Sequence, residues 1–176
     1  MTEGLWAAVI GVGGTILGTI LGFFLGKIDI GRLKVNVKKI KETPCYDHGE
    51  MYEYNERILI RLYNGANKNR VFRNAEVIFK DSNNNELLTI PLKDLATTRT
   101  ASCGIFTEDV GIINIQPKCG ADIDAKFSIN DMEKAYKAKK VFLKYYNEKF
   151  RAKTKELWDC EYTKFAKLSK EQKNNG

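Results

Sequence analysis

An uncharged apolar run of 22 residues near the N-terminus limits the fold of this chain more than any other feature. The run covers residues 5–26, and the first charged residue after it is Lys27. As an α-helix it would span roughly 33 Å at 1.5 Å per residue, which is enough to cross the hydrocarbon core of a bilayer. A lone segment in hydrocarbon must form its own backbone hydrogen bonds, so we expect a single transmembrane helix over about residues 5–25.

A cleaved signal peptide is the alternative to an anchor. Such a peptide has a basic beginning, a shorter apolar stretch and small residues at its cleavage site. Here the chain begins Met-Thr-Glu-Gly, without Lys or Arg, and the run ends in Phe23, Phe24, Leu25 and Gly26. We therefore predict that the anchor is not cleaved.

Basic residues follow the apolar run, and no Lys or Arg precedes it. Because Lys and Arg near a span stay on the cytoplasmic side, we expect the N-terminus outside and the C-terminal domain in the cytoplasm. The same residues are candidates for contact with anionic lipid at the membrane surface, although enforcing the topology would explain them equally well. They are Lys27, Arg32, Lys34, Lys38 and Lys39.

Glycines recur at every fourth residue of the run, at Gly14, Gly18, Gly22 and Gly26. Ridges of small residues at this spacing let membrane helices approach closely, so the glycine zipper predicts self-association of the helix. The alternative is that these four glycines only fill space, because glycine is common in membrane helices in general.

The hydrophobic period changes from helical to two after the anchor, which is typical of half-buried strands. The clearest case is residues 121–130, where apolar and polar residues alternate strictly. Six less regular runs lie near residues 33–37, 58–62, 75–79, 88–90, 113–115 and 141–145, with turn-forming residues at 64–67, 81–85 and 117–120. Many short strands joined by close turns predict a mainly β fold, and we favour an immunoglobulin-like β-sandwich.

Helical spacing returns after residue 149, where Phe150, Leu157, Trp158, Phe165 and Leu168 fall on one side. We expect an amphipathic basic helix there, packed on the domain or on a membrane, with a final strand over 150–158 as the alternative. The chain then divides into a transmembrane anchor (1–26), a basic neck with the first strand (27–42), a sandwich (43–148) and a C-terminal basic helix and tail (149–176).

The net charge of +7 is concentrated outside the predicted sandwich. Residues 43–130 carry ten basic and twelve acidic residues, whereas the neck (27–42) carries six and two, and residues 131–176 carry thirteen and seven. A nucleic-acid binder needs a basic groove on its folded surface. We therefore expect no nucleic-acid partner.

The sequence does not contain a recognisable catalytic or metal-binding motif. Four cysteines (Cys45, Cys103, Cys119 and Cys160) are too widely spaced for a preformed zinc site, and in the cytoplasm they should be free thiols. His48 is the single histidine, so it is the single candidate base for a Cys or Ser nucleophile. The loop at 81–85 begins like a calcium-binding loop but has Glu86 and Leu92 where Gly and Glu are required.

These observations favour a single-pass, membrane-anchored binding or adaptor module without catalytic activity or cofactor. Its expected partners are the bilayer, a second copy through the helix, and an unknown protein or small-molecule ligand. Two long polar connections, 47–56 and 93–109, are candidate binding loops, or else surface loops without a role. The alternative function is a membrane-active effector, whose Gly-rich helix oligomerises under control of a ligand-sensing sandwich. An enzyme at the membrane would require a pocket that brings His48 to a cysteine and carboxylates.

Overall fold

The computed structural model describes residues 14–15, 18–20, 31–48 and 50–159 of the chain. Residues 14–15 and 18–20 have helical backbone, and the rest of the predicted transmembrane run lies outside the described residues. In the part of the chain that is described, no helix has the length and apolarity needed to cross a membrane. The anchor therefore stays a prediction from the sequence.

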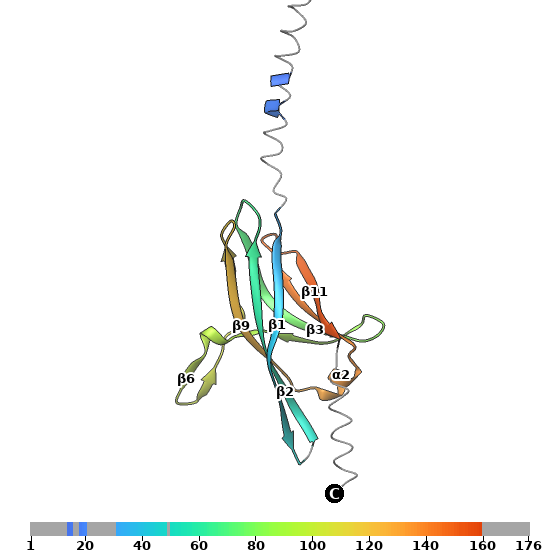
Figure 1. Ribbon diagram of the computed structural model, residues 1–176. Helices are drawn as coiled ribbons and strands as arrows, with labels where there is room; N and C mark the ends of the chain where they lie inside the picture. The colour runs from blue at the N-terminus through green and yellow to red at the C-terminus, as the bar shows by residue number, and fades with distance from the viewer. Residues whose placement is uncertain (1–13, 16–17, 21–30, 49, 160–176) are drawn as a thin grey trace, which may run out of the picture.

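The described residues from Gly31 onward form an immunoglobulin-like β-sandwich, which confirms the predicted mainly β fold (Figure 1). One sheet consists of β1 (Leu33–Asp47), β2 (Glu50–Asn64), β9 (Gly120–Ile129) and β5 (Lys93–Asp94), in that order. The facing sheet has the order β11 (Ala152–Asp159), β10 (Lys140–Tyr146), β3 (Arg70–Lys80) and β4 (Glu86–Pro91), and β8 (Ile113–Ile115) also pairs with β3.

Three smaller elements complete the described fold. A short ribbon pairs β6 (Arg99–Ala101) with β7 (Gly104–Phe106), and the 3-10 helix η1 (Leu95–Thr97) precedes it. The helix α2 (Met132–Lys137) connects β9 to β10. Asp131 caps α2, because its side chain accepts a hydrogen bond from the Lys134 amide.

The core lies between the two sheets, and period-two alternation explains which residues enter it. In β9, Ile123, Ala125, Phe127 and Ile129 are buried, while the residues between them face outward. The facing strand β3 contributes buried apolar side chains, and Phe79 packs edge-on against Phe127, with ring centroids 6.1 Å apart. Each fully buried side chain of this size contributes about 1.5–3 kcal/mol through the hydrophobic effect.

The predicted loop at 47–56 is wrong, because β1 continues to Asp47 and β2 begins at Glu50. Strand β9 pairs with β2 only from Tyr54 onward, so the first residues of β2 and the last of β1 form a two-stranded ribbon beyond the sheet (Figure 1). Both faces of such a ribbon meet solvent or a small helix, which explains why its sequence is polar and lacks clean alternation.

The predicted loop at 93–109 is also built differently, since it contains β5, η1 and the β6–β7 hairpin. The hairpin projects from the side of the sandwich (Figure 1). Strand β1, which the predicted neck contains, begins at Leu33 and continues across the expected boundary at residue 43.

The predicted C-terminal helix is wrong over 152–159, where the chain forms the strand β11. Strand β11 pairs antiparallel with β10 and supplies hydrogen bonds to an edge that would otherwise be open. Leu157 and Trp158 pack against the core from this strand, while Phe150 lies in the preceding turn. Phe165 and Leu168, which completed the helical pattern, lie outside the described residues.

Candidate functional site at the entry end of the sandwich

The residues considered for nucleophilic chemistry do not form a common pocket within the described residues. His48 lies in the β1–β2 turn with its side chain 96% exposed, and its Nε2 is 3.7 Å from an oxygen of Asp47. The free thiols of Cys103 and Cys119 lie in the β6–β7 turn and in the loop before β9, respectively. Cys45 is a half-buried free thiol in β1, and its sulfur accepts a hydrogen bond from Asn55.

The sequence-predicted packing and membrane-contact residues are only partly described. Gly14 and Gly18 lie in helical backbone with nothing within 4 Å of an added Cβ atom, while Gly22, Gly26 and Lys27 are outside the described residues. Arg32 lies immediately before β1, and Lys34 and Lys38 are exposed along that strand.

Lys39 points inward instead of toward solvent. Its ammonium is 3.5 Å from the carboxylate of Glu56, which is fully buried, and 2.7 Å from Glu42. It also lies over the ring of Trp158, 4.5 Å from the ring centre. Burial alone would lower the pKa of Lys39, but hydrogen bonds and charge from Glu42 and Glu56 outweigh it and raise that pKa. These contacts with Glu42, Glu56 and Trp158 hold the Lys39 side chain within the sandwich.

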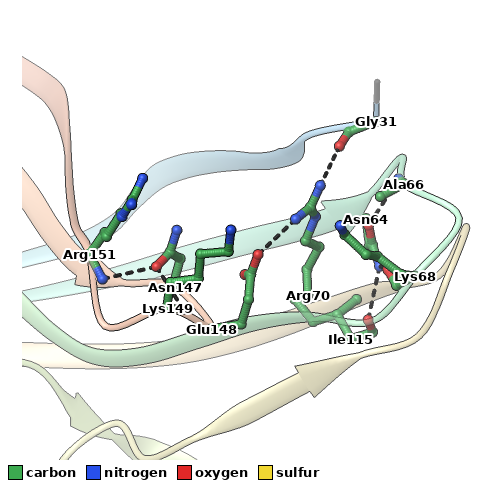
Figure 2. Close-up of polar contacts among 10 residues, drawn as sticks. All are labelled: Gly31, Asn64, Ala66, Lys68, Arg70, Ile115, Asn147, Glu148, Lys149 and Arg151. Atoms are coloured by element: carbon green, nitrogen blue, oxygen red, sulfur yellow. Dashed lines mark hydrogen bonds and ion pairs between the residues drawn. The ribbon is translucent and has the colours of Figure 1, made fainter. Parts of the chain in front are cut away.

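Three loops gather where the chain enters β1, and we call this region the entry end. It comprises loops 65–69, 116–119 and 147–151, together with Gly31 and Arg32. Figure 2 shows Gly31 with residues of the first and third of these loops. An alanine side chain at Gly31 would place its Cβ 2.2 Å from the Cα of Ala66. The carbonyl of Arg32 also accepts a hydrogen bond from the Gly65 amide at 3.3 Å. The first residues of the domain are therefore packed directly on loop 65–69.

Asn64 joins two of these loops from a fully buried position at the end of β2. Its Nδ2 donates to the carbonyls of Lys68 at 2.8 Å and Ile115 at 2.9 Å, and its Oδ1 accepts from the Ala66 amide (Figure 2). The same Nδ2 donates to the carbonyl of Gln116, in loop 116–119, at 3.1 Å. Buried polar groups are stable only when they are hydrogen-bonded in this way. The asparagine thus fixes the backbone of both loops at the entry end.

Arg70, at the start of β3, links the entry point to the opposite hairpin. Its guanidinium donates to the Gly31 carbonyl at 2.9 Å and to the Glu148 carboxylate at 2.7 Å (Figure 2). Burial opposes ionisation of Glu148, but its hydrogen bonds and the charge of Arg70 outweigh burial and hold the pKa of Glu148 below its usual value. The carboxylate is therefore ionised at neutral pH and neutralises part of the positive charge here.

A cavity of about 540 Å³ opens beside this ion pair. Its lining combines apolar and aromatic side chains with three cations and one carboxylate, contributed by the ends of four strands and the turn after β10. The lining residues are Arg32, Leu33, Arg70, Val71, Tyr145, Asn147, Glu148 and Lys153. This arrangement suits an anionic ligand, because the cations exceed the carboxylate.

The β10–β11 turn completes the entry end. Asn147 orders it, because its Oδ1 accepts hydrogen bonds from the amides of Lys149 and Arg151. Phe150 has a positive φ of 54° and a side chain 71% exposed, with the Arg73 guanidinium 4.2 Å from its ring centre. The turn thus presents an aromatic ring to solvent, on a residue with a basic neighbour on each side in the sequence.

The two hairpins away from the entry end also expose large apolar side chains. On the β1–β2 ribbon these are Tyr46 and Tyr52, which are 46% and 54% exposed. On the β6–β7 hairpin they are Ile105 and Phe106, which are 70% and 54% exposed. The sequence had indicated both segments as candidate binding regions, but as loops rather than hairpins.

Several solved structures are similar to this chain, and none of the curated proteins matches it. The putative ApaA protein from Bordetella pertussis is 10% identical with a TM-score of 0.43, over 75% of this chain and 93% of that one. An ApaG protein from Pseudomonas aeruginosa is 17% identical with a TM-score of 0.36, over 63% and 92%. An uncharacterised β-sandwich protein from Clostridium difficile is 10% identical with a TM-score of 0.33, over 72% and 86%.

A family model described as the YopI Ig-like domain matches residues 31–158. The match begins at Gly31, where the chain enters the sandwich, and ends at Trp158 in β11. It therefore covers the sandwich from the entry end to its last described strand.

Proposed function

The chain belongs to the family of YopI Ig-like domains, and we propose that it is a membrane-anchored binding or adaptor module. In this proposal a single N-terminal helix anchors the chain, its N-terminus lies outside, and the sandwich lies in the cytoplasm. The module has no catalytic step of its own. It presents the two hairpins that point away from the entry end to a soluble protein partner.

The observation that carries this proposal is the exposure of apolar side chains on two hairpins that point away from the entry end. Tyr52 on the ribbon and Ile105 and Phe106 on the β6–β7 hairpin are each more than half exposed. Apolar side chains grouped on projecting elements are typical of protein-binding surfaces, since water contact with them is unfavourable. The hydrophobic core is complete without them.

Residues at the entry end support the tether. The close packing of Gly31 on Ala66 and the hydrogen bond from Arg70 to the Gly31 carbonyl fix the first described residue of the sandwich. In the proposed arrangement the end that contains Gly31 faces the bilayer, which leaves the two hairpins accessible from the cytoplasm.

Site-specific photo-crosslinking in living cells tests the binding surface. A photoreactive amino acid at Phe106 should give a discrete adduct of higher mass, because a bound partner covers the hairpin. The same amino acid at Asp122, which is exposed on the outer face of the sheet, should not. Adding Ile105→Asp to the Phe106 probe should reduce the adduct about tenfold, since a charge in an apolar contact costs more than 1.4 kcal/mol.

Two results would contradict the proposal. Equal adduct formation from positions 106 and 122 would indicate random collisions, and a yield unaffected by Ile105→Asp would show that the apolar hairpin is not the contact. Ile105 is exposed in a peripheral hairpin, so this substitution leaves the core intact.

A further inference from the structure

The two ends of the sandwich differ in charge. The loops of the entry end contain Lys68, Lys118, Lys149 and Arg151, with Glu148 as their only acidic residue. The far tip of the β1–β2 ribbon, residues 45–54, carries three carboxylates and no Lys or Arg. The sequence order hides this separation, because the basic loops come from three distant parts of the chain.

Several cations at the entry end are available for a ligand. Within the described residues, the side chains of Arg32, Lys149, Arg151 and Lys153 form no ion pair, whereas Arg70 is paired with Glu148. Arg32 and Lys153 line the 540 Å³ cavity, and Lys149 and Arg151 flank Phe150 in the adjacent turn. Unpaired cations close together repel one another, so an anion bound among them is stabilised.

Phe150 adds an apolar contact at the same surface. Phe150 lies between Lys149 and Arg151 in the sequence, and its ring centre is 4.2 Å from the Arg73 guanidinium. The hydrogen bonds of Asn147 hold the turn that carries it. Exposed aromatic rings beside basic residues suit the boundary between lipid headgroups and acyl chains, where one side is wet and the other apolar.

The position of the entry end indicates which kind of anionic ligand it binds. The predicted anchor reaches the domain at Gly31, so the residues around Gly31 lie nearest to the bilayer. The cytoplasmic leaflet is negatively charged and attracts basic segments within about 10 Å of its surface. Lys38 lies six residues after Arg32, or roughly 20 Å farther along an extended strand, which is beyond that range.

We propose that the entry end binds anionic phospholipid, with Phe150 inserted at the headgroup level and a headgroup phosphate in the cavity between Arg32 and Lys153. This inference rests on the proposed membrane anchor. It assigns the membrane contact to the three loops and Arg32, and leaves Lys38 and Lys39 without a part in it. Because this surface lies around Gly31, where the predicted anchor reaches the domain, lipid binding would keep the entry end of the sandwich facing the bilayer.

Hydrogen exchange of the full chain in lipid nanodiscs tests the inference. Discs of phosphatidylcholine alone are compared with discs that also contain phosphatidylglycerol. Amides of residues 147–151 should exchange roughly tenfold more slowly in the anionic discs, and high salt should reverse this protection. Amides of β6 and β7 should exchange equally in both discs.

Charge-matched variants identify the surface. The triple variant Lys149→Gln, Arg151→Gln and Lys153→Gln should lose the protection, because it removes three of the cations that bind the anionic lipid. These side chains form no ion pair within the described residues, so their loss breaks none. The control Lys38→Gln, Lys126→Gln and Lys139→Gln removes the same charge elsewhere and should keep it. Phe150→Asn, which suits the positive φ, should reduce the protection in part.

Each outcome separates the inference from the proposed function. A chain that alkaline carbonate extracts from membranes would overturn the anchor, and the inference with it. An anchored chain with protection that is equal in both discs, or that the control triple also loses, would overturn the inference alone. Protection produced in phosphatidylcholine discs by inorganic phosphate would assign the cavity to a soluble anion and overturn the lipid proposal.

Discussion

At the residue scale, the most informative position is Glu56, a carboxylate at an inward-facing position of β2. Its neighbours on the same face, Tyr54 and Ile58, are fully buried apolar residues. A buried carboxylate is tolerated when a cation accompanies it, and Lys39 supplies that charge from the adjacent strand. Trp158 of β11 covers the cation, so the pair connects the edges of the two facing sheets.

Substitution of Lys39 tests this arrangement. Lys39→Met should lower the free energy of unfolding by about 2 kcal/mol, because Glu56 would lose its charged partner in the core. We expect less than the full cost of a broken buried pair, since the Lys39 side chain is 35% exposed. Chemical denaturation of the detergent-solubilised chain, followed by circular dichroism, gives the value.

The neighbouring lysine provides the control for that experiment. Lys38→Met removes the same charge one residue earlier on the exposed side of β1, and should change the unfolding free energy by less than about 0.5 kcal/mol. Equal losses from both substitutions would show that general charge, rather than the pair with Glu56, accounts for the effect.

At the element scale, the important feature is the contact between the start of β1 and loop 65–69. Gly31 fits against Ala66 only because it lacks a side chain, and Gly65 donates to the carbonyl of Arg32. Asn64 also holds this loop, through hydrogen bonds with Ala66 and Lys68, and joins it to Ile115 through a third. Packing and hydrogen bonds therefore order the entry end from Gly31 onward.

Gly31→Ala should disturb this contact, because its Cβ would lie 2.2 Å from backbone atoms of Ala66. We expect a loss of about 1–3 kcal/mol, as for other overpacked sites, and faster hydrogen exchange in loop 65–69. Gly65→Ala is the matched control, since its Cβ would meet the Arg32 carbonyl at an ordinary 3.5 Å. If both variants exchange like the parent chain, the contact does not fix the entry of β1.

At the scale of the whole molecule, the sandwich is polarised along its long axis. Basic loops and the cavity occupy the end where the chain enters. The β1–β2 ribbon, whose tip is acidic, projects from the other end (Figure 1). Such a separation of charge orients a tethered domain on an anionic surface, because attraction and repulsion act on opposite ends.

The exposed cysteines provide a test of orientation without altering the fold. Cys103 and Cys119 should resist a membrane-impermeant maleimide in intact spheroplasts and react after permeabilisation, because we expect the domain in the cytoplasm. The double variant Cys103→Ser and Cys119→Ser should lose most of the labelling in the permeabilised sample. Labelling in intact spheroplasts would place the sandwich outside and contradict the proposed topology.

Much of the β fold could be predicted from local patterns, whereas the site could not. The strand around 121–130 was evident because its apolar residues alternate, and the runs at 33–37, 58–62 and 75–79 also became strands. The membrane-contact prediction included Lys39 because Lys39 follows the apolar run closely. Only the pairing of β1 with β2 brings Glu56 beside it. The glycine zipper and the effector function that depends on it stay predictions.

The sequence by itself determined the apolar run, the period-two strands and the absence of a clustered metal or catalytic motif, because these depend on neighbouring residues. The tertiary structure decided the rest. Residues 152–159 became a strand because β10 offered an edge to pair with. Loops 65–69, 116–119 and 147–151 became one basic surface because the sheet order brings their strand ends together. Pairing between distant segments depends on topology, and periodicity along the chain carries no record of it.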